Sequence, residues 1–133
     1  MNVQETTENY LETILMLHQE RGFVRSVDVA NRMGYSKPTI SEQMKKFRAQ
    51  GYVEMDESGY ITLTPAGDAI ARRIYERHVV IAQMLMSLGV EEQVASADAC
   101  KIEHDLSEES WARLRAHFAA YRNKAASPRS EAT

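Results

Sequence analysis

The hydrophobic pattern changes its period at Gly51, and this change constrains the fold more than any other feature of the 133-residue sequence. Before Gly51, apolar residues recur every three or four positions, which is typical of helices. After it, Val53 and Met55 alternate with polar residues, and Ile61 and Leu63 resume the alternation beyond a turn-like segment. The sequence therefore predicts helices followed by a β-hairpin.

Three helices are expected before the hairpin, and the first covers about residues 7–20. The second begins behind Ser26, a suitable N-cap, and ends before Gly34. Ser36 caps the third, and Pro38 falls in its first turn, where a missing N–H costs nothing. Two short helices joined by a turn and followed by a hairpin predict a winged helix-turn-helix.

The segment after the hairpin is predicted to be helical. Thr64 and Pro65 open a long helix to about Ser87, a further helix covers residues 91–105, and Ser107 caps a last one. The expected fold is mainly α with a small β-hairpin. Its expected parts are a winged helix-turn-helix domain at 1–64, a helical domain at 65–122 and a disordered tail at 123–133. Apolar residues expected in the core of the helical domain or in contacts between two copies of the chain are Ile81, Leu85, Leu88, Trp111, Leu114 and Phe118.

The charge distribution favours a nucleic-acid partner for the third helix, although the net charge is −3. Residues 32–48 hold five basic residues and one acid, a stripe that can contact phosphates. If Ile40, Met44 and Phe47 face the core, the opposite face presents a set of polar residues to a DNA groove. Those expected at base edges and phosphates are Ser36, Lys37, Pro38, Thr39, Glu42 and Gln43, with Lys45, Lys46 and Arg48 along the backbone. The plainer alternative is a helical pair with a solvated basic face.

Composition narrows the remaining classes. The single cysteine excludes an intramolecular disulfide, and no apolar run approaches the roughly 20 residues that a membrane span needs. The first residues lack the basic and apolar regions of a secretion signal. We therefore expect a cytoplasmic protein without a membrane partner or organic cofactor.

A second group of residues predicts metal binding. Cys100, Glu103 and His104 stand at i, i+3 and i+4, so they would share one face of a helix. His78 on the preceding helix could fold back beside them, and the first helix carries two more oxygen donors one turn apart. The six candidate ligands are thus Cys100, Glu103, His104, His78, Glu12 and Asn9.

Two other interpretations of this group stay open. A lone cysteine is often a buried apolar residue, and Glu103 and His104 could be a solvated pair. An enzyme could use Cys100 as nucleophile and His104 as base. However, no Gly-rich turn follows the cysteine and nothing indicates an oxyanion hole, so we do not expect an enzyme.

Five motifs are spread along almost the whole chain, to about Tyr121. They are Thr6-Thr-Glu-Asn-Tyr-Leu-Glu-Thr-Ile, Ser36-Lys-Pro-Thr-Ile-Ser-Glu, Leu63-Thr-Pro-Ala-Gly, Arg77-His78 and Cys100-Lys-Ile-Glu-His104-Asp-Leu-Ser. Together they resemble the diphtheria toxin repressor and manganese transport regulator family. The resemblance implies a homodimeric, metal-activated transcriptional repressor of metal homeostasis genes, with a winged helix, a helical dimerisation domain and a palindromic operator. It also implies a short form that ends before any SH3-like domain.

The resemblance implies ligands from both branches of the family. Cys100, Glu103 and His104 fall on the iron-type site, whereas Glu12, His78, Glu103 and His104 fall on manganese-type positions. Asn9 stands where the two branches carry methionine or aspartate. Two more residues, Ala82 and Ser96, replace ligands of the second iron-type site, which is therefore expected to be absent in its usual form.

The thiolate of Cys100 bears on the identity of the metal. Thiolate ligands disfavour Mn(II), which prefers oxygen, and suit Fe(II), Co(II), Ni(II) and Zn(II) better. We therefore expect Fe(II) first and Mn(II) next, with Zn(II), Co(II) or Ni(II) binding in vitro. The alternative function is a winged-helix regulator that senses an oxidant or an organic ligand through Cys100 without metal.

Overall fold

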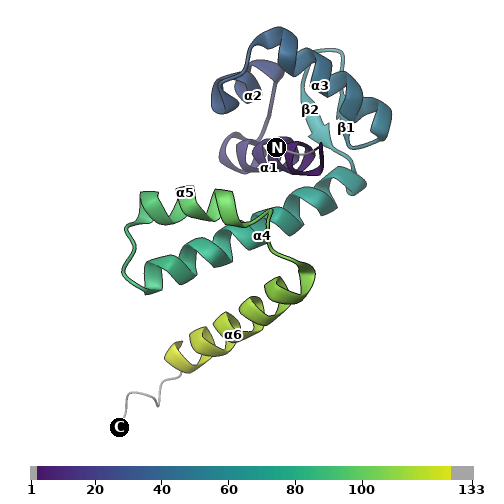
Figure 1. Ribbon diagram of the computed structural model, residues 1–133. Helices are drawn as coiled ribbons and strands as arrows, with labels where there is room; N and C mark the ends of the chain where they lie inside the picture. The colour runs from purple at the N-terminus through teal and green to yellow at the C-terminus, as the bar shows by residue number, and fades with distance from the viewer. Residues whose placement is uncertain (1–2, 127–133) are drawn as a thin grey trace. The chain divides into compact units, whose positions relative to one another are not determined.

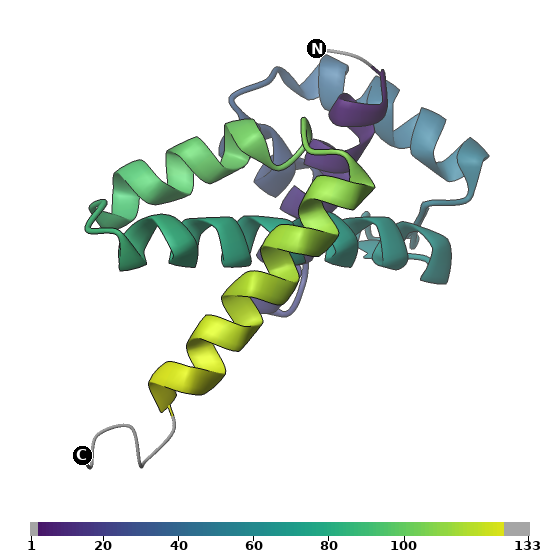
Figure 2. The same ribbon diagram turned by 60° about the horizontal axis from the view of Figure 1, so that its bottom comes forward.

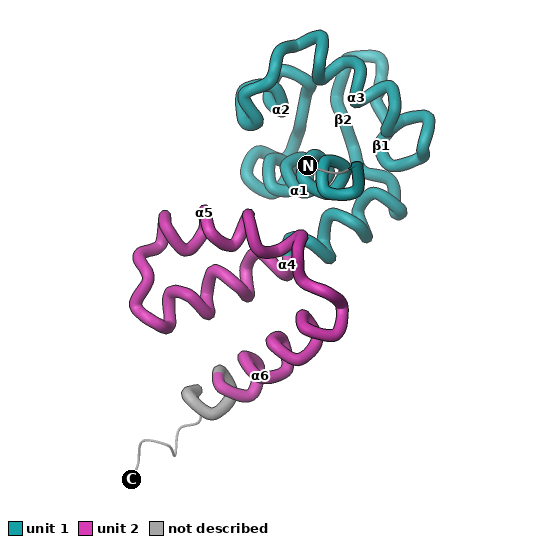
Figure 3. The backbone as a smooth tube through the Cα atoms, in the orientation of Figure 1, with its two compact units in different colours: residues 1–75 teal, residues 76–133 magenta. Residues whose placement is uncertain are grey.

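The computed structural model describes residues 3–126 and confirms a mainly helical fold with one small hairpin (Figure 1). The elements are α1 (Val3–Arg21), α2 (Ser26–Met33), α3 (Lys37–Gln50), β1 (Val53–Met55), β2 (Ile61–Leu63), α4 (Pro65–Ser87), α5 (Glu92–Ile102) and α6 (Glu108–Ala126). The chain divides into two compact units, residues 1–75 and 76–133 (Figure 3). None of the described helices is both long and apolar enough to cross a membrane.

The first unit packs α1, α2, α3 and the hairpin around one apolar core. As the periodicity predicts, Ile40, Met44 and Phe47 of α3 are buried in it. The start of α3 is also as expected, because the Ser36 side chain accepts the backbone N–H of Thr39 at 3.3 Å. These contacts leave the opposite face of α3 in solvent.

The start of α2 differs from the prediction. Arg25, and not Ser26, occupies the N-cap position, and Ser26 is the first helical residue. The reason is the carboxylate of Asp28, which accepts the backbone N–H of Arg25 at 2.9 Å and thereby sets the beginning of the helix one residue earlier. The turn between α2 and α3 is as predicted, since Gly34 ends α2 with a left-handed backbone (φ 75°).

The hairpin pairs β1 with β2 in antiparallel register, with Val53 opposite Leu63 and Met55 opposite Ile61. The Asp56 carboxylate organises the turn by accepting the backbone N–H groups of Ser58 and Tyr60, both at 2.9 Å. A short pairing between Arg25 and Tyr60 ties the hairpin to the segment before α2. Both contacts hold the hairpin at its turn end.

The beginning of α4 is fixed by a close approach of backbones. Thr64 caps the helix by accepting the N–H of Gly67 at 3.1 Å. A Cβ atom on Gly67 would lie 2.1 Å from the carbonyl oxygen of Tyr52, so only glycine fits this position. From there α4 runs without a break for 23 residues (Figure 2).

The second unit contains the C-terminal part of α4 together with α5 and α6. Ile81, Ala99 and Trp111 form a small apolar cluster in it. The Ser107 side chain accepts the N–H of Ser110 at 3.1 Å and so caps α6, as predicted. Helix α6 continues to Ala126, past the predicted start of the tail at 123, and the rest of the tail (127–133) lies outside the described residues.

Helix α5 is shorter than expected. The sequence predicts a helix over 91–105, but α5 ends at Ile102 and a turn follows. The side chain of Glu91 caps its start by accepting the N–H groups of Gln93 and Val94. Since Glu103 keeps helical dihedral angles at the C-cap, its side chain still follows the helical spacing from Cys100.

Candidate metal centre and nucleic-acid interface

Three of the candidate ligands meet in the second unit. His78 of α4, Cys100 of α5 and Glu103 at the end of α5 each offer one ligand atom, and these atoms all lie within 4.8 Å of one another. The Nδ1 atom of His78 lies 3.0 Å from Oε1 of Glu103 and 3.6 Å from Sγ of Cys100. We call these three residues the His–Cys–Glu cluster.

The imidazole of His78 has a defined partner on each nitrogen. Its Nδ1 faces Cys100 and Glu103, while its Nε2 lies 3.3 Å from the hydroxyl oxygen of Ser96. The contact with Cys100, followed by that with Glu103, raises the pKa of His78 from its usual 6.5 to about 10. With this pKa, His78 carries a proton on each ring nitrogen at neutral pH. A metal ion that binds Nδ1 would displace the proton there, so metal binding would release a proton.

Glu103 is a fully buried carboxylate. One oxygen contacts His78, and the other lies 3.3 Å from Nε2 of His104. His104, whose side chain is also almost completely buried, thus adjoins the cluster but is not one of its three members. A buried carboxylate needs a positive partner, because isolating its charge from water is costly. A divalent cation would supply that charge directly.

The donor set of the cluster fits a first-row divalent metal. It combines an imidazole nitrogen, a thiolate sulfur and a carboxylate oxygen, the three ligand types that such ions take from proteins. Cys100 is exposed, which gives an ion access to the cluster from solvent. The arrangement therefore favours the ligand interpretation of Cys100 over that of a buried apolar residue.

Arg77 supports the cluster and was not among the predicted site residues. Its buried guanidinium donates through Nη1 to the carbonyl oxygens of Glu103 and Leu106, each at 3.0 Å. Its Nη2 pairs with the carboxylate of Glu108 at 2.8 Å, and the group lies over the Trp111 ring. These contacts hold the turn after α5. The sequence placed Arg77 only in a motif beside His78.

The last two predicted ligands, Asn9 and Glu12, lie on α1 in the first unit. Glu12 is buried, with only 5% of its surface exposed. The participation of Asn9 and Glu12 in the metal centre stays a prediction.

The predicted DNA-contacting residues lie on α3 or at its start, and all except the half-buried Gln43 are exposed. Among the described residues, Lys37, Lys45, Lys46 and Arg48 form no ion pair, so their charges are available to phosphates. Arg32 differs, although it counted toward the basic stripe. It pairs with Glu20 at 2.6 Å, and this hydrogen bond lowers the pKa of Glu20.

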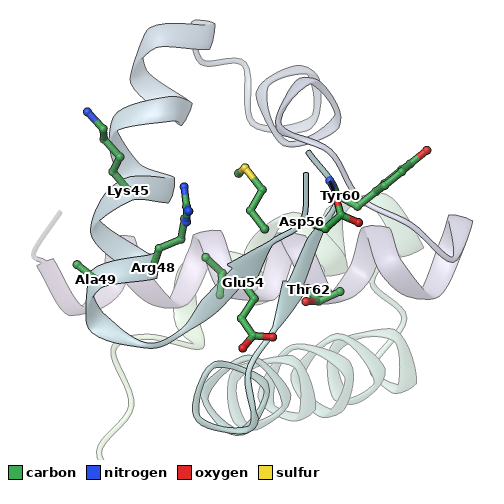
Figure 4. A pocket seen from close by; sticks show the side chains of 9 residues that line it. Lys45, Arg48, Ala49, Glu54, Asp56, Tyr60 and Thr62 are labelled. Atoms are coloured by element: carbon green, nitrogen blue, oxygen red, sulfur yellow. Dashed lines mark hydrogen bonds between the residues drawn. The ribbon is translucent and has the colours of Figure 1, made fainter. Parts of the chain in front are cut away.

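The predicted DNA-contacting side chains of α3 line three separate hollows. Lys45 and Arg48 line a hollow between α3 and the hairpin, where Figure 4 shows both cationic ends extending from the helix. Gln43 and Lys46 line another hollow, next to α1. Lys37 shares a third hollow with Ser41, an exposed residue that the sequence analysis left out although it stands one turn after Lys37.

Comparison with known families covers almost the whole chain. Residues 2–65 match the model of the iron dependent repressor N-terminal DNA binding domain. Residues 64–124 match that of the iron dependent repressor metal binding and dimerisation domain. A winged helix joined to a helical unit with a metal-ligand cluster defines a class of metal-responsive transcriptional regulators. The chain belongs to the iron-dependent repressor family, as the five motifs indicate.

Relatives with curated names agree with this assignment. The transcriptional regulator MntR of Salmonella typhimurium is 36% identical over 107 residues, which cover 80% of this chain and 68% of the relative. An uncharacterised helix-turn-helix regulator of Methanocaldococcus jannaschii is 31% identical over 124 residues, covering 92% of this chain and 99% of the relative. Members of the family are transcriptional regulators, which agrees with the expectation that the chain is not an enzyme.

Solved structures show the same fold. A manganese-dependent transcriptional repressor in complex with manganese matches 85% of this chain with a TM-score of 0.75 and 29% identity. The manganese regulator SloR matches 85% with a TM-score of 0.72 and 27% identity. The chain spans about half the length of these two proteins, 52% and 53% respectively.

Proposed function

We propose that this protein is a metal-activated transcriptional repressor that binds operator DNA as a homodimer and controls metal homeostasis genes. The observation that carries the proposal is the His–Cys–Glu cluster in the second unit of this chain. That unit follows a segment that matches the DNA binding domain of the family. Lys37, Lys45, Lys46 and Arg48 supply the unpaired positive charge that contact with DNA phosphates requires.

Two arguments about the metal point in different directions. Two solved neighbours are named as a manganese regulator and a manganese-dependent repressor, which favours Mn(II). The thiolate of Cys100 disfavours Mn(II) and suits Fe(II) better. Because Cys100 belongs to this chain itself, we give its chemistry more weight than the names of similar proteins. We propose Fe(II) as the activating metal and Mn(II) as the alternative.

Activation would work through coupling between two binding equilibria. If metal and DNA both favour one conformation, each tightens binding of the other by the same factor, typically about 5- to 150-fold. His78, Cys100 and Glu103 would hold the metal, with His104, Glu12 and Asn9 as the further ligands that the sequence predicts. The metal would supply fixed positive charge at the buried carboxylate of Glu103.

The proposed homodimer is supported by the surface of the second unit. Leu88 has 80% of its surface exposed, although the sequence analysis placed it in the core or a dimer contact. Met84, Phe118 and Tyr121 line a hollow beside it. A partner copy that covers these side chains would remove apolar surface from water and place two reading helices on the two halves of a palindromic operator.

Fluorescence anisotropy on duplex DNA tests the proposal. The duplex is selected from a random library with Fe(II)-loaded protein and again with Mn(II)-loaded protein. We expect binding with metal and its loss with chelator. Cys100→Ala and His78→Ala should lose the metal response, while Ser110→Ala, at an exposed position of α6, should keep it. Equal binding without metal would contradict the mechanism. Reversal by oxidant without any chelator effect would instead support redox sensing by Cys100.

The same assay distinguishes the metals. Cys100→Glu replaces the thiolate with a carboxylate, so the variant should respond to Mn(II) at lower concentrations than the native protein does, and to Fe(II) at higher ones. If the native protein already responds to Mn(II) at lower concentrations than to Fe(II), the preference for Fe(II) is wrong.

A further inference from the structure

The hydroxyl of Ser96 lies beside the imidazole of His78. Ser96 lies on α5, one helical turn before Cys100, and its hydroxyl oxygen is 3.3 Å from Nε2 of His78. The other nitrogen, Nδ1, is the one that lies near Cys100 and Glu103. The two sides of the ring therefore face different partners, a hydroxyl on one side and two ligand atoms on the other.

The chemistry of a bound imidazole matches this arrangement. A histidine that binds a metal through one nitrogen carries its proton on the other, and a partner that accepts this proton fixes the orientation of the ring. With a metal on Nδ1, the Nε2–H group would donate to Ser96 Oγ. The hydroxyl of Ser96 can accept this bond because it has two lone pairs and a rotatable proton.

We propose that Ser96 is a positioning residue that makes Nδ1 of His78 the metal-binding atom and reserves Nε2 for a hydrogen bond. This inference rests on the proposed metal site and adds the residue that orients its histidine. It also limits the number of metal ions that His78 can bind. Since Nε2 is committed to Ser96, His78 serves one metal ion and cannot join two through its two nitrogens.

The first experiment measures the bound nitrogen directly. The full chain is labelled with ¹⁵N, loaded with diamagnetic Zn(II), and its histidine nitrogens are recorded by long-range ¹H–¹⁵N NMR. His78→Gln identifies the signals of His78. We expect Nδ1 to carry the metal and Nε2 to carry the proton. Metal on Nε2 would overturn the proposal, and this result needs no Ser96 variant to fold.

The second experiment tests the hydroxyl. Ser96→Ala should weaken Co(II) binding by about 10-fold, at the lower end of the effect typical for the hydrogen-bond partner of a metal ligand. Ser96→Thr, which keeps the hydroxyl, should restore the affinity. The matched control is Ser87→Ala, because the hydroxyl of Ser87 donates only to a backbone carbonyl, that of Met84. The sulfur-to-cobalt absorption band should persist in all three variants.

The outcomes separate this inference from the proposed function. If the native protein binds neither Co(II) nor Zn(II), the proposed metal site itself fails. If the native protein binds Co(II) with the sulfur band and Ser96→Ala binds with native affinity, the role of Ser96 is wrong while the metal site stands. A loss in Ser96→Ala that Ser96→Thr does not restore would also contradict the role of the hydroxyl.

Discussion

The two units differ in what they bury. The first encloses fourteen apolar residues in one continuous core, among them Tyr10, Leu11 and Phe47. Among the described residues, the apolar cluster of the second unit contains Ile81, Ala99 and Trp111. Both units bury charged side chains, Glu8 and Glu12 in the first and Arg77 and Glu103 in the second. Because its apolar core is much larger, the first unit is stabilised mainly by that core, while polar contacts carry a larger share of the stability of the second.

This contrast suggests a division of roles. A continuous apolar core keeps the DNA-binding unit in one conformation whatever the metal concentration. A small core with buried charges is sensitive to the ions and partners that bind to it, because these change how well the charges are compensated. The second unit is thus suited to sensing and the first to reading DNA.

The largest expected effect tests the core of the first unit. Leu11 is fully buried, so Leu11→Ala should lower the free energy of unfolding by about 2–5 kcal/mol through lost burial and a cavity. Urea denaturation with metal and with chelator measures it. The loss should be the same in both conditions. A loss that differs between the two conditions would show that the core around Leu11 is coupled to the metal centre.

The next effect tests the polar contacts of the second unit. Arg77→Ala leaves the carbonyl oxygens of Glu103 and Leu106 without their donor, and it should destabilise the protein by about 2–4 kcal/mol. Glu108→Gln is the control, since the carboxylate of Glu108 is mostly exposed and its ion pair should contribute roughly 1 kcal/mol or less. Equal losses in the two variants would show that the exposed ion pair, and not the carbonyl contacts, stabilises the turn.

A smaller effect is expected at the start of α4. Gly67→Ala places a methyl group against the backbone of Tyr52, which should cost about 1–3 kcal/mol through a forced backbone shift. The control is Ala66→Gly, since position 66 is exposed on the same helical turn. Thermal unfolding of both variants measures the difference. A native melting temperature for Gly67→Ala would contradict the close approach seen here.

The smallest effect concerns the basic residues of the DNA-binding unit. Lys45→Ala should reduce the slope of log affinity for DNA against log salt by roughly 0.9, because one phosphate contact is lost. Arg32→Ala should leave that slope unchanged, since Arg32 pairs with Glu20 within the protein. Anisotropy titrations over a series of salt concentrations compare the two. A larger change for Arg32→Ala would contradict this assignment of the basic residues.

The fold could be predicted where local rules decide the structure. The hairpin, the Ser36 cap and the turn at Gly34 follow from turn, capping and periodicity signals within a few residues. The end of α5 could not, because the contacts that hold the following turn come from Arg77, 26 residues before Glu103. A contact of such sequence separation leaves no periodic signal.

The candidate site shows the same limit. The spacing of Cys100 and Glu103 in the sequence predicts that they share one face of a helix, and both are members of the His–Cys–Glu cluster. It also groups His104 with them, although the structure places His78 beside Cys100 and His104 next to Glu103. The participation of His104 as a ligand stays a prediction. The sequence analysis mentions Ser96 only as a residue that stands where the second iron-type site has a ligand. Its contact with His78 could not be predicted, because that contact requires the packing of α5 on α4.

X-ray absorption spectroscopy of the metal-loaded protein tests the central claim most directly, because it reports the atoms bonded to the metal. Samples of the native protein and of Cys100→Ser are loaded with one equivalent of Fe(II) without oxygen. The account predicts one sulfur neighbour together with nitrogen and oxygen in the native protein, and no sulfur in the variant. A native spectrum with only nitrogen and oxygen neighbours would contradict a metal centre built on His78, Cys100 and Glu103.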